Sequence, residues 1–195
     1  ALAQRQFEIY LQPKYNLRTH QPAGAEALVR WRHPEKGIIS PGEFIPIFEG
    51  NGFITKLDYY VWEQACMLLA AWKEQGLDPQ PISVNVSRVN LYHHDFVGIM
   101  LELVRRYRLK PRMLQLEMTE TAYTDSPEIM CKTVAKLREE GFEILMDDFG
   151  SGYSSLNILK DIEVDILKID MRFLSESASP GRGENIIASV VRMAK

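Results

Sequence analysis

The chain has 195 residues, of which 46% are hydrophobic and 25% are charged, a composition typical of a globular domain and not of a disordered or fibrous chain. The formal net charge of −3 excludes a surface that is basic throughout, so we expect no binding of long nucleic acid. No apolar run approaches the ~18 residues that cross a bilayer, so we expect no membrane contact from this segment.

The cysteines indicate the cellular compartment of this domain, and the chain ends indicate that it belongs to a larger protein. Cys66 and Cys131 lie far apart and form no CxxC pair, which favours reduced thiols in a cytoplasmic protein or in the cytoplasmic part of a larger membrane-associated one. The first ten residues lead directly into an apolar strand, and residues 183–195 stop inside an amphipathic helical pattern. We therefore expect residues 1–195 to be one domain excised from a larger protein.

Strand and helix patterns alternate along the chain. In chain order, the pattern predicts strands at 7–11 and 22–30, helices at 41–49 and 55–76, a strand at 82–86, a helix at 96–107, a strand at 113–118, a helix from 127, a strand at 142–147, a short helix near 154–160, a strand at 165–169 and a final helix. The later strands start roughly 25 to 30 residues apart, which is the length of a βαβ unit. Repeated units of this kind predict a parallel sheet.

Several helix ends carry recognisable signals. Ser40 and Glu43 predict a capping box, with Pro41 in the first turn. Thr55 is the expected cap of the next helix, and Gly76 is expected to end it. A further helix is expected to begin at Pro127 with Ser126 as its cap.

Two observations favour a closed barrel over an open doubly wound sheet. Polar residues fall at the end of nearly every strand, whereas a doubly wound sheet concentrates its chemistry at one switch point. Six strands are predicted, and a complete barrel needs about 250 residues. We therefore expect a TIM-like (β/α)8 barrel that is truncated after its sixth strand, with roughly two βα units beyond Lys195.

The strongest chemical signal is the pair Asp147–Asp148 at a strand end. Adjacent carboxylates repel each other, and a cation relieves that cost. The alternative is a helix N-terminus, where acids are also favoured by the helix dipole.

Three more polar residues close strands at equivalent positions, namely Glu26, Asn85 and Glu117. Taken alone, each glutamate is better explained by a salt bridge, and Arg30 is available to Glu26. Taken with the aspartate pair, they favour a shared site, because the carboxyl ends of barrel strands converge on one face. Hard oxygen ligands of this kind suit a divalent cation.

Lys168 lies between apolar residues in the last predicted strand. An inward lysine at this position could hold a phosphate or activate a metal-bound water. The alternative is a structural ion pair with Asp147 or Asp148, and the two roles are compatible.

A glycine-rich turn at 150–152 follows one of these strands. Together with Asp170 it partly matches a dinucleotide-binding turn, but Ser155 stands where the third glycine belongs. A loop that bends over a ligand beside the aspartate pair explains the glycines better.

These motifs resemble those of one family, the EAL-domain cyclic di-GMP phosphodiesterases. In this chain they are YLQP (10–13), EALVRW (26–31), PGEFIPIFE (41–49), SVNVS (83–87), LEMTE (116–120), DDFGSGYSSL (147–156) and LKID (167–170). They occur in the family's order and cover the chain almost from end to end.

The resemblance implies a TIM-like barrel with one antiparallel strand, and metal-dependent hydrolysis of cyclic di-GMP to linear pGpG in bacterial second-messenger signalling. It implies two Mg²⁺ or Mn²⁺ ions, a homodimer, and other signalling domains in the same protein. The residues it assigns are Glu26, Asn85, Glu117 and Asp147 as metal ligands, Asp148 at a second ion, Lys168 holding or deprotonating the attacking water, Arg30 at a phosphate, Gln12 at the nucleotide, and Glu120 bracing the loop 149–154 that links metal and dimer interface.

One departure and two rival functions remain. A further metal-binding glutamate and a terminal glutamine of the family would lie beyond Lys195 and are absent from this sequence. The main rival function is a catalytically inactive sensor that binds cyclic di-GMP, although a receptor has no need of a costly acid cluster. The other is an unrelated metal-dependent barrel enzyme or a dinucleotide-binding oxidoreductase, which the missing third glycine disfavours.

Overall fold

The computed structural model of the protein describes residues 1–150, 160–170 and 190–192, except for the side chains of residues 123–125. Its strands are β1 (Phe7–Tyr15), β2 (Pro22–His33), β3 (Gly37–Ile39), β4 (Ile82–Asn85), β5 (Leu114–Thr119), β6 (Ile144–Phe149) and β7 (Ile166–Ile169). Its α-helices are α1 (Pro41–Gly50), α2 (Ile54–Glu74), α3 (Arg88–Leu91), α4 (Phe96–Arg106), α5 (Glu120–Asp125) and α6 (Pro127–Glu139).

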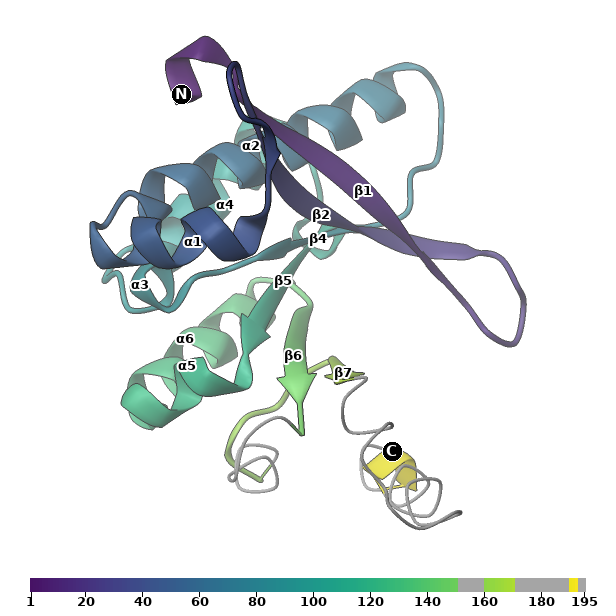
Figure 1. The fold of residues 1–195 in the computed structure, drawn as a ribbon. Helices are drawn as coiled ribbons and strands as arrows, with labels where there is room; N and C mark the ends of the chain where they lie inside the picture. The colour runs from purple at the N-terminus through teal and green to yellow at the C-terminus, as the bar shows by residue number, and fades with distance from the viewer. Residues whose placement is uncertain (151–159, 171–189, 193–195) are drawn as a thin grey trace, which may run out of the picture.

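The strands form one sheet in the order β1-β2-β4-β5-β6-β7, with β3 paired to β2 off this path. From β2 to β7 all neighbours are parallel, whereas β1 runs antiparallel to β2. Figure 1 shows the helices on one side of this sheet, with β1 and β7 at its two ends. Over the described residues the strands therefore form a mostly parallel α/β sheet that is not closed, in agreement with the predicted truncated barrel.

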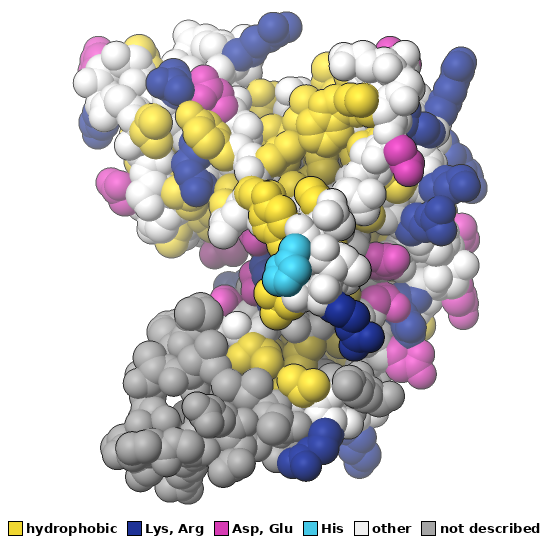
Figure 2. All heavy atoms as spheres, turned by 90° about the vertical axis from the view of Figure 1, so that its right-hand side faces the viewer, with side chains coloured by type: hydrophobic (Ala, Val, Ile, Leu, Met, Phe, Trp, Pro, Cys, Tyr) yellow, Lys and Arg dark blue, Asp and Glu magenta, His cyan; other side chains and the backbone are white. Residues whose placement is uncertain are grey.

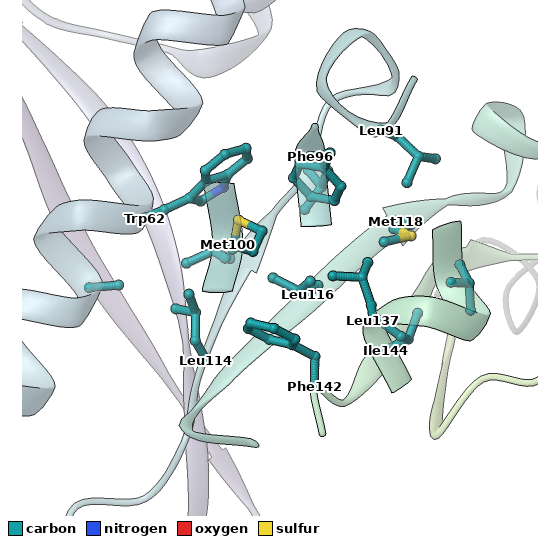
Figure 3. Close-up of a cluster of buried hydrophobic side chains, with 14 of the residues drawn as sticks. Trp62, Leu91, Phe96, Met100, Leu114, Leu116, Met118, Leu137, Phe142 and Ile144 are labelled. Atoms are coloured by element: carbon teal, nitrogen blue, oxygen red, sulfur yellow. The ribbon is translucent and has the colours of Figure 1, made fainter. Parts of the chain in front are cut away.

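The core fills the space between the sheet and its helices. Trp62 from α2 and Met100 from α4 pack against β5 and β6 through Leu116 and Ile144, and all four are buried (Figure 3). Central strand β5 is buried over its first five residues. A second, smaller cluster around Phe7 joins the start of β1 to α1 and α2.

The predicted helix signals mostly hold. The capping box at α1 is confirmed, since the carboxylate of Glu43 accepts a hydrogen bond of 3.4 Å from the backbone N–H of Ser40. Gly76 follows the end of α2 with a φ of +77°, a left-handed conformation that glycine adopts at little cost. The prediction that Thr55 caps α2 was wrong. The helix begins at Ile54, and the Thr55 hydroxyl donates back to the carbonyl of Gly52.

Short elements were missed. The three-residue strand β3 and the short helices α3 and α5 are too brief for a hydrophobic period to show in the sequence. Because β3 pairs antiparallel with β2, the sheet contains a second antiparallel strand besides β1. The helix predicted near 154–160 and most of the final predicted helix lie outside the described residues.

Among the helices that the structure describes, none combines the length and the apolar character required to traverse a bilayer.

Candidate metal centre

The parallel pairing of the strands brings the predicted site residues to one end of the sheet. Asn85 at the end of β4 lies opposite Glu117 on β5, and Asp147 on β6 lies opposite Thr119. Glu26 on β2 pairs with Ser83, two residues before Asn85. Because side chains alternate along a strand, these polar groups point to the same face of the sheet.

Glu26, Glu117 and Asp147 form a compact group, which we call the acid cluster. Each offers one carboxylate oxygen, and these oxygens lie within 4.8 Å of one another. Figure 2 shows the side of the molecule away from the helices, where acidic and basic side chains gather at a hollow in the surface. Three carboxylates at this spacing are stable only with positive charge between them.

Lys168 supplies that charge in the structure. Its Nζ lies 2.6 Å from Oε2 of Glu117, 3.0 Å from Oε2 of Glu26 and 3.0 Å from Oδ2 of Asp147. Partial burial on its own would lower the pKa of Lys168, but the hydrogen bonds and charges of these carboxylates outweigh burial and raise it. The predicted ion pair with Asp147 is formed, and it extends to both glutamates.

Glu117 is the most buried member of the acid cluster, with 1% of its surface exposed. Burial raises the pKa of its carboxyl group, and the hydrogen bond from Lys168 opposes that rise. Its second oxygen, Oε1, is buried and has no hydrogen-bond partner among the residues that the structure describes, and the ammonium of Lys14 lies 3.8 Å from it. A buried carboxylate oxygen without a hydrogen bond is costly, and binding to a cation would relieve that cost.

Asn85 lies beside the cluster. Its side-chain amide donates a hydrogen bond of 3.2 Å to Oε1 of Glu26, so it holds that carboxylate from the side away from Lys168. The set of three carboxylates and one amide fits a hard divalent cation such as Mg²⁺ or Mn²⁺.

Asp148 is placed differently from its neighbour. It is exposed, has a φ of +55°, and donates its backbone N–H to Oδ1 of Asp147 at 2.9 Å. Among the described residues, the three-acid group does not include Asp148, so its predicted role at a second ion stays a prediction.

Glu120 is buried at the start of α5 and accepts a hydrogen bond of 3.2 Å from the backbone N–H of Gly150. This bond joins Glu120 to the second residue of the loop 149–154, and the predicted bracing of that loop stays a prediction. The glycine-rich turn continues into residues 151 and 152, which lie outside the described residues.

A cavity of about 600 Å³ opens beside Glu26 and Asn85, and Arg30 also lines it. Gln12 is exposed and lies directly opposite Glu26 across the β1–β2 pair. The alternative ion pair between Glu26 and Arg30 is not formed, because the Arg30 guanidinium donates to the carbonyl of Val29 at 2.9 Å while Glu26 binds Lys168.

Sequence reasoning missed a polar layer beneath the acid cluster. The ammonium of Lys14 donates to the Ser83 hydroxyl at 3.0 Å and to the Gln115 side-chain oxygen at 2.9 Å. Gln115 in turn donates to Glu143 at 2.6 Å. A signal was present, since Lys14 follows Gln12 at the period-two spacing that places both on the face of Glu26.

Asp58 on α2 was also missed. It is 9% exposed and lines the same cavity as Asn85. The sequence signal was an acid at a core position of the apolar helical pattern that contains Leu57 and Val61.

Comparisons with known proteins agree with this geometry. The sequence profile of the EAL domain matches residues 1–195. The chain is 34% identical over 195 residues to the bifunctional diguanylate cyclase/cyclic di-GMP phosphodiesterase MucR of Pseudomonas aeruginosa, covering 100% of this chain and 28% of that protein. It is 31% identical over 188 residues to the cyclic di-GMP phosphodiesterase PA2567 of the same organism, covering 96% of this chain and 32% of that protein. The chain thus spans about a third or less of these curated relatives.

Solved structures share the fold. The PaMucR phosphodiesterase in complex with c-di-GMP superimposes with a TM-score of 0.89 at 34% identity, covering 98% of this chain and 78% of that one. The FimX EAL domain from Pseudomonas aeruginosa bound to c-di-GMP gives a TM-score of 0.87 at 22% identity, covering 100% and 79%. The second likeness supports the fold alone.

Proposed function

The chain belongs to the EAL domain family, and on that premise we propose that it hydrolyses one phosphodiester bond of cyclic di-GMP to give linear pGpG. The observation that carries this proposal is the meeting of Glu26, Glu117 and Asp147 around Lys168 at the carboxyl end of the strands. That end of a barrel is where enzymes of this fold place their chemistry.

The residues present fit a divalent metal. Glu26, Asn85, Glu117 and Asp147 would hold Mg²⁺ or Mn²⁺, and Asp148 would serve a second ion. Such ions, when bound, lower the pKa of a coordinated water and screen the negative charge of a phosphodiester.

Lys168 would hold the attacking water or a phosphate oxygen. In the arrangement described, the hydrogen bonds and charges of its carboxylate partners raise the pKa of Lys168, and its ammonium donates hydrogen bonds to them; deprotonation of the water would follow once a cation takes over these carboxylates. Arg30 would bind a phosphate and Gln12 the nucleotide from the walls beside the acid cluster. Positioning and charge stabilisation of this kind supply most of the catalysis in phosphoryl transfer.

We also propose that the segment acts in the cytoplasm, forms a homodimer, and works with other signalling domains in the same protein. The relatives support the last point, because the chain covers 28% of a protein named for both a cyclase and a phosphodiesterase activity.

The test is incubation of the protein with cyclic di-GMP and Mn²⁺, with the products separated by chromatography. Formation of pGpG by the unaltered protein, and its loss in Glu117→Gln, supports hydrolysis. Binding of cyclic di-GMP without any pGpG would instead identify an inactive sensor. Absence of both binding and turnover would refute the proposal.

A further inference from the structure

Helix α2 contacts the carboxyl end of β4 through two buried side chains one helical turn apart. Asp58 is 9% exposed and Trp62 is 1% exposed. Both reach the segment that connects β4 to α3, and that segment begins with Asn85, the amide at the acid cluster.

The contacts are directed at the backbone of this connection. The Asp58 carboxylate accepts a hydrogen bond of 3.0 Å from the backbone N–H of Ser87 and one of 2.8 Å from the side-chain amide of Asn90. The indole N–H of Trp62 donates to the carbonyl of Asn85 at 3.0 Å. Together these bonds hold the last residue of β4, the connection itself at Ser87, and helix α3 at Asn90.

Packing alone does not account for an aspartate here. A buried carboxylate costs stability, and burial raises the pKa of Asp58 to about 6. An apolar side chain at this core position would avoid that cost but would leave the Ser87 N–H without this acceptor. What the carboxylate does, and an apolar side chain cannot do, is hold the connection in this conformation.

Asn85 directly precedes two anchored points of the backbone. The backbone N–H of Val86 donates to the carbonyl of Glu117 at 2.9 Å, which ties Val86 to β5. The next residue, Ser87, is tied to α2 through Asp58. Beside these anchors the Asn85 amide donates to Glu26 at 3.2 Å. Asp58 and Asn85 also line the same cavity.

We propose, on the premise of the function proposed above, that Asp58 is a positioning residue for Asn85. By clamping Ser87 and Asn90, it holds the Asn85 side chain against Glu26 in the orientation that metal binding requires. Trp62 assists through its hydrogen bond to the backbone carbonyl of Asn85. Groups that orient metal ligands in this way typically change metal affinity or activity about 10–100-fold when they are altered.

The first test needs neither metal nor nucleotide. In protein labelled with ¹⁵N-asparagine, the side-chain amide signals of Asn85 are identified by their loss in Asn85→Ser. We expect Asp58→Asn to shift or broaden these signals, because a neutral amide oxygen accepts the hydrogen bonds from Ser87 and Asn90 more weakly than the charged carboxylate does. Unchanged Asn85 signals in a folded Asp58→Asn protein would overturn the proposal.

The second test measures Mn²⁺ binding by electron paramagnetic resonance and the kinetic constants for cyclic di-GMP. We expect Asp58→Asn to weaken Mn²⁺ binding about 10–100-fold and to lower kcat more than it raises KM. Asn90→Ala, which leaves the Ser87 bond in place, should act in the same direction to a smaller extent and serves if Asp58→Asn does not fold.

Two controls separate positioning from general destabilisation. Val104→Ala removes buried volume from α4, and Glu74→Gln removes an exposed charge from the end of α2. Both should keep the Asn85 signals and the Mn²⁺ affinity within about twofold of the unaltered protein. If Val104→Ala weakens Mn²⁺ binding as much as Asp58→Asn does, the effect is one of stability and the proposal is wrong. Failure of the unaltered protein to form pGpG would refute the hydrolysis, whereas the Asn85 signals would still decide the positioning.

Discussion

The ammonium of Lys168 lies 2.6 Å from Oε2 of Glu117, and this pair joins the ends of two strands that are not neighbours in the sheet, β5 and β7. Lys168 also contacts Glu26 on β2 and Asp147 on β6. One lysine thus pairs with acids from three strands, at the position where a divalent cation would also contact them.

Glu117→Gln should abolish hydrolysis while leaving the fold intact. The variant keeps the volume of the buried side chain but loses the negative charge that holds a cation. We expect pGpG formation to fall about a thousandfold or more, equivalent to ~4 kcal/mol of lost transition-state stabilisation. The free energy of unfolding should change by less than ~2 kcal/mol. Turnover close to that of the unaltered protein would remove Glu117 from the ligand set.

Chelation should stop turnover, and added Mg²⁺ or Mn²⁺ should restore it. The same ions should stabilise the folded protein, because they bind the native acid cluster and not the unfolded chain. At a concentration of 100 times Kd the gain is about 2.7 kcal/mol. Thermal melting with and without metal measures it, and cleavage that persists in excess chelator would contradict the proposed mechanism.

Lys168→Met should make the protein more dependent on metal for stability. Without the ammonium, three carboxylates are left close together, and we expect a loss of roughly 3 kcal/mol in metal-free buffer. Mn²⁺ should then raise the melting temperature more than it does for the unaltered protein. Lys56→Met, which removes an exposed lysine from α2, is the matched control. An equal metal response in all three proteins would mean that Lys168 and the cation do not share the same carboxylates.

Asp58 should give the stability a pH dependence of defined sign. Burial, opposed in part by hydrogen bonds from Ser87 and Asn90, raises its pKa from 3.8 to about 6, so between these values the folded protein binds more protons than the unfolded chain. The contribution of Asp58 to the free energy of unfolding is therefore fully present below pH 3.8. It falls as the pH rises to about 6, by about 3 kcal/mol in total. In urea unfolding from pH 4 to 7, Asp58→Asn should lack this decline. If the difference in the free energy of unfolding between the unaltered protein and Asp58→Asn stays constant with pH, the pKa of Asp58 is not raised.

The two thiols should differ in reactivity. Burial raises the pKa of Cys66 to about 12, and its side chain is fully buried, whereas Cys131 is partly exposed. A disulfide reagent should therefore modify Cys131 in the native protein and Cys66 only after unfolding. Rapid reaction of both thiols in native buffer would show that α2 opens far more readily than its packing implies.

Much of the fold was predictable because its signals are local. The capping box at Ser40, the proline start of α6 and the glycine end of α2 are decided by residues within one helical turn. The period of apolar residues correctly placed Phe96, Met100 and Leu103 on the buried face of α4. Strand β3 could not be predicted in this way, because three residues carry no period and its pairing with β2 is what forms it.

The partners of the charged residues could not be predicted from local sequence. Arg30 stands four residues from Glu26, yet Glu26 pairs with Lys168, 142 residues away. No role was predicted for Lys14, although it reaches across the sheet and donates hydrogen bonds to Ser83 and Gln115. An ion pair depends on distance in space, and only the register of the parallel strands sets that distance.

By itself, the sequence determined the elements, the family and the residue types available at the strand ends, since each of these depends on spacing along the chain. The sequence also predicted that Glu26, Glu117 and Asp147 share a site. The tertiary structure alone decided that Lys168 pairs with all three of these acids and that Asp58 and Trp62 hold the connection after Asn85. The physical reason is that electrostatic attraction and hydrogen bonding act over a few ångströms, and only the pairing of β2, β4, β5, β6 and β7 in one parallel sheet brings these groups that close.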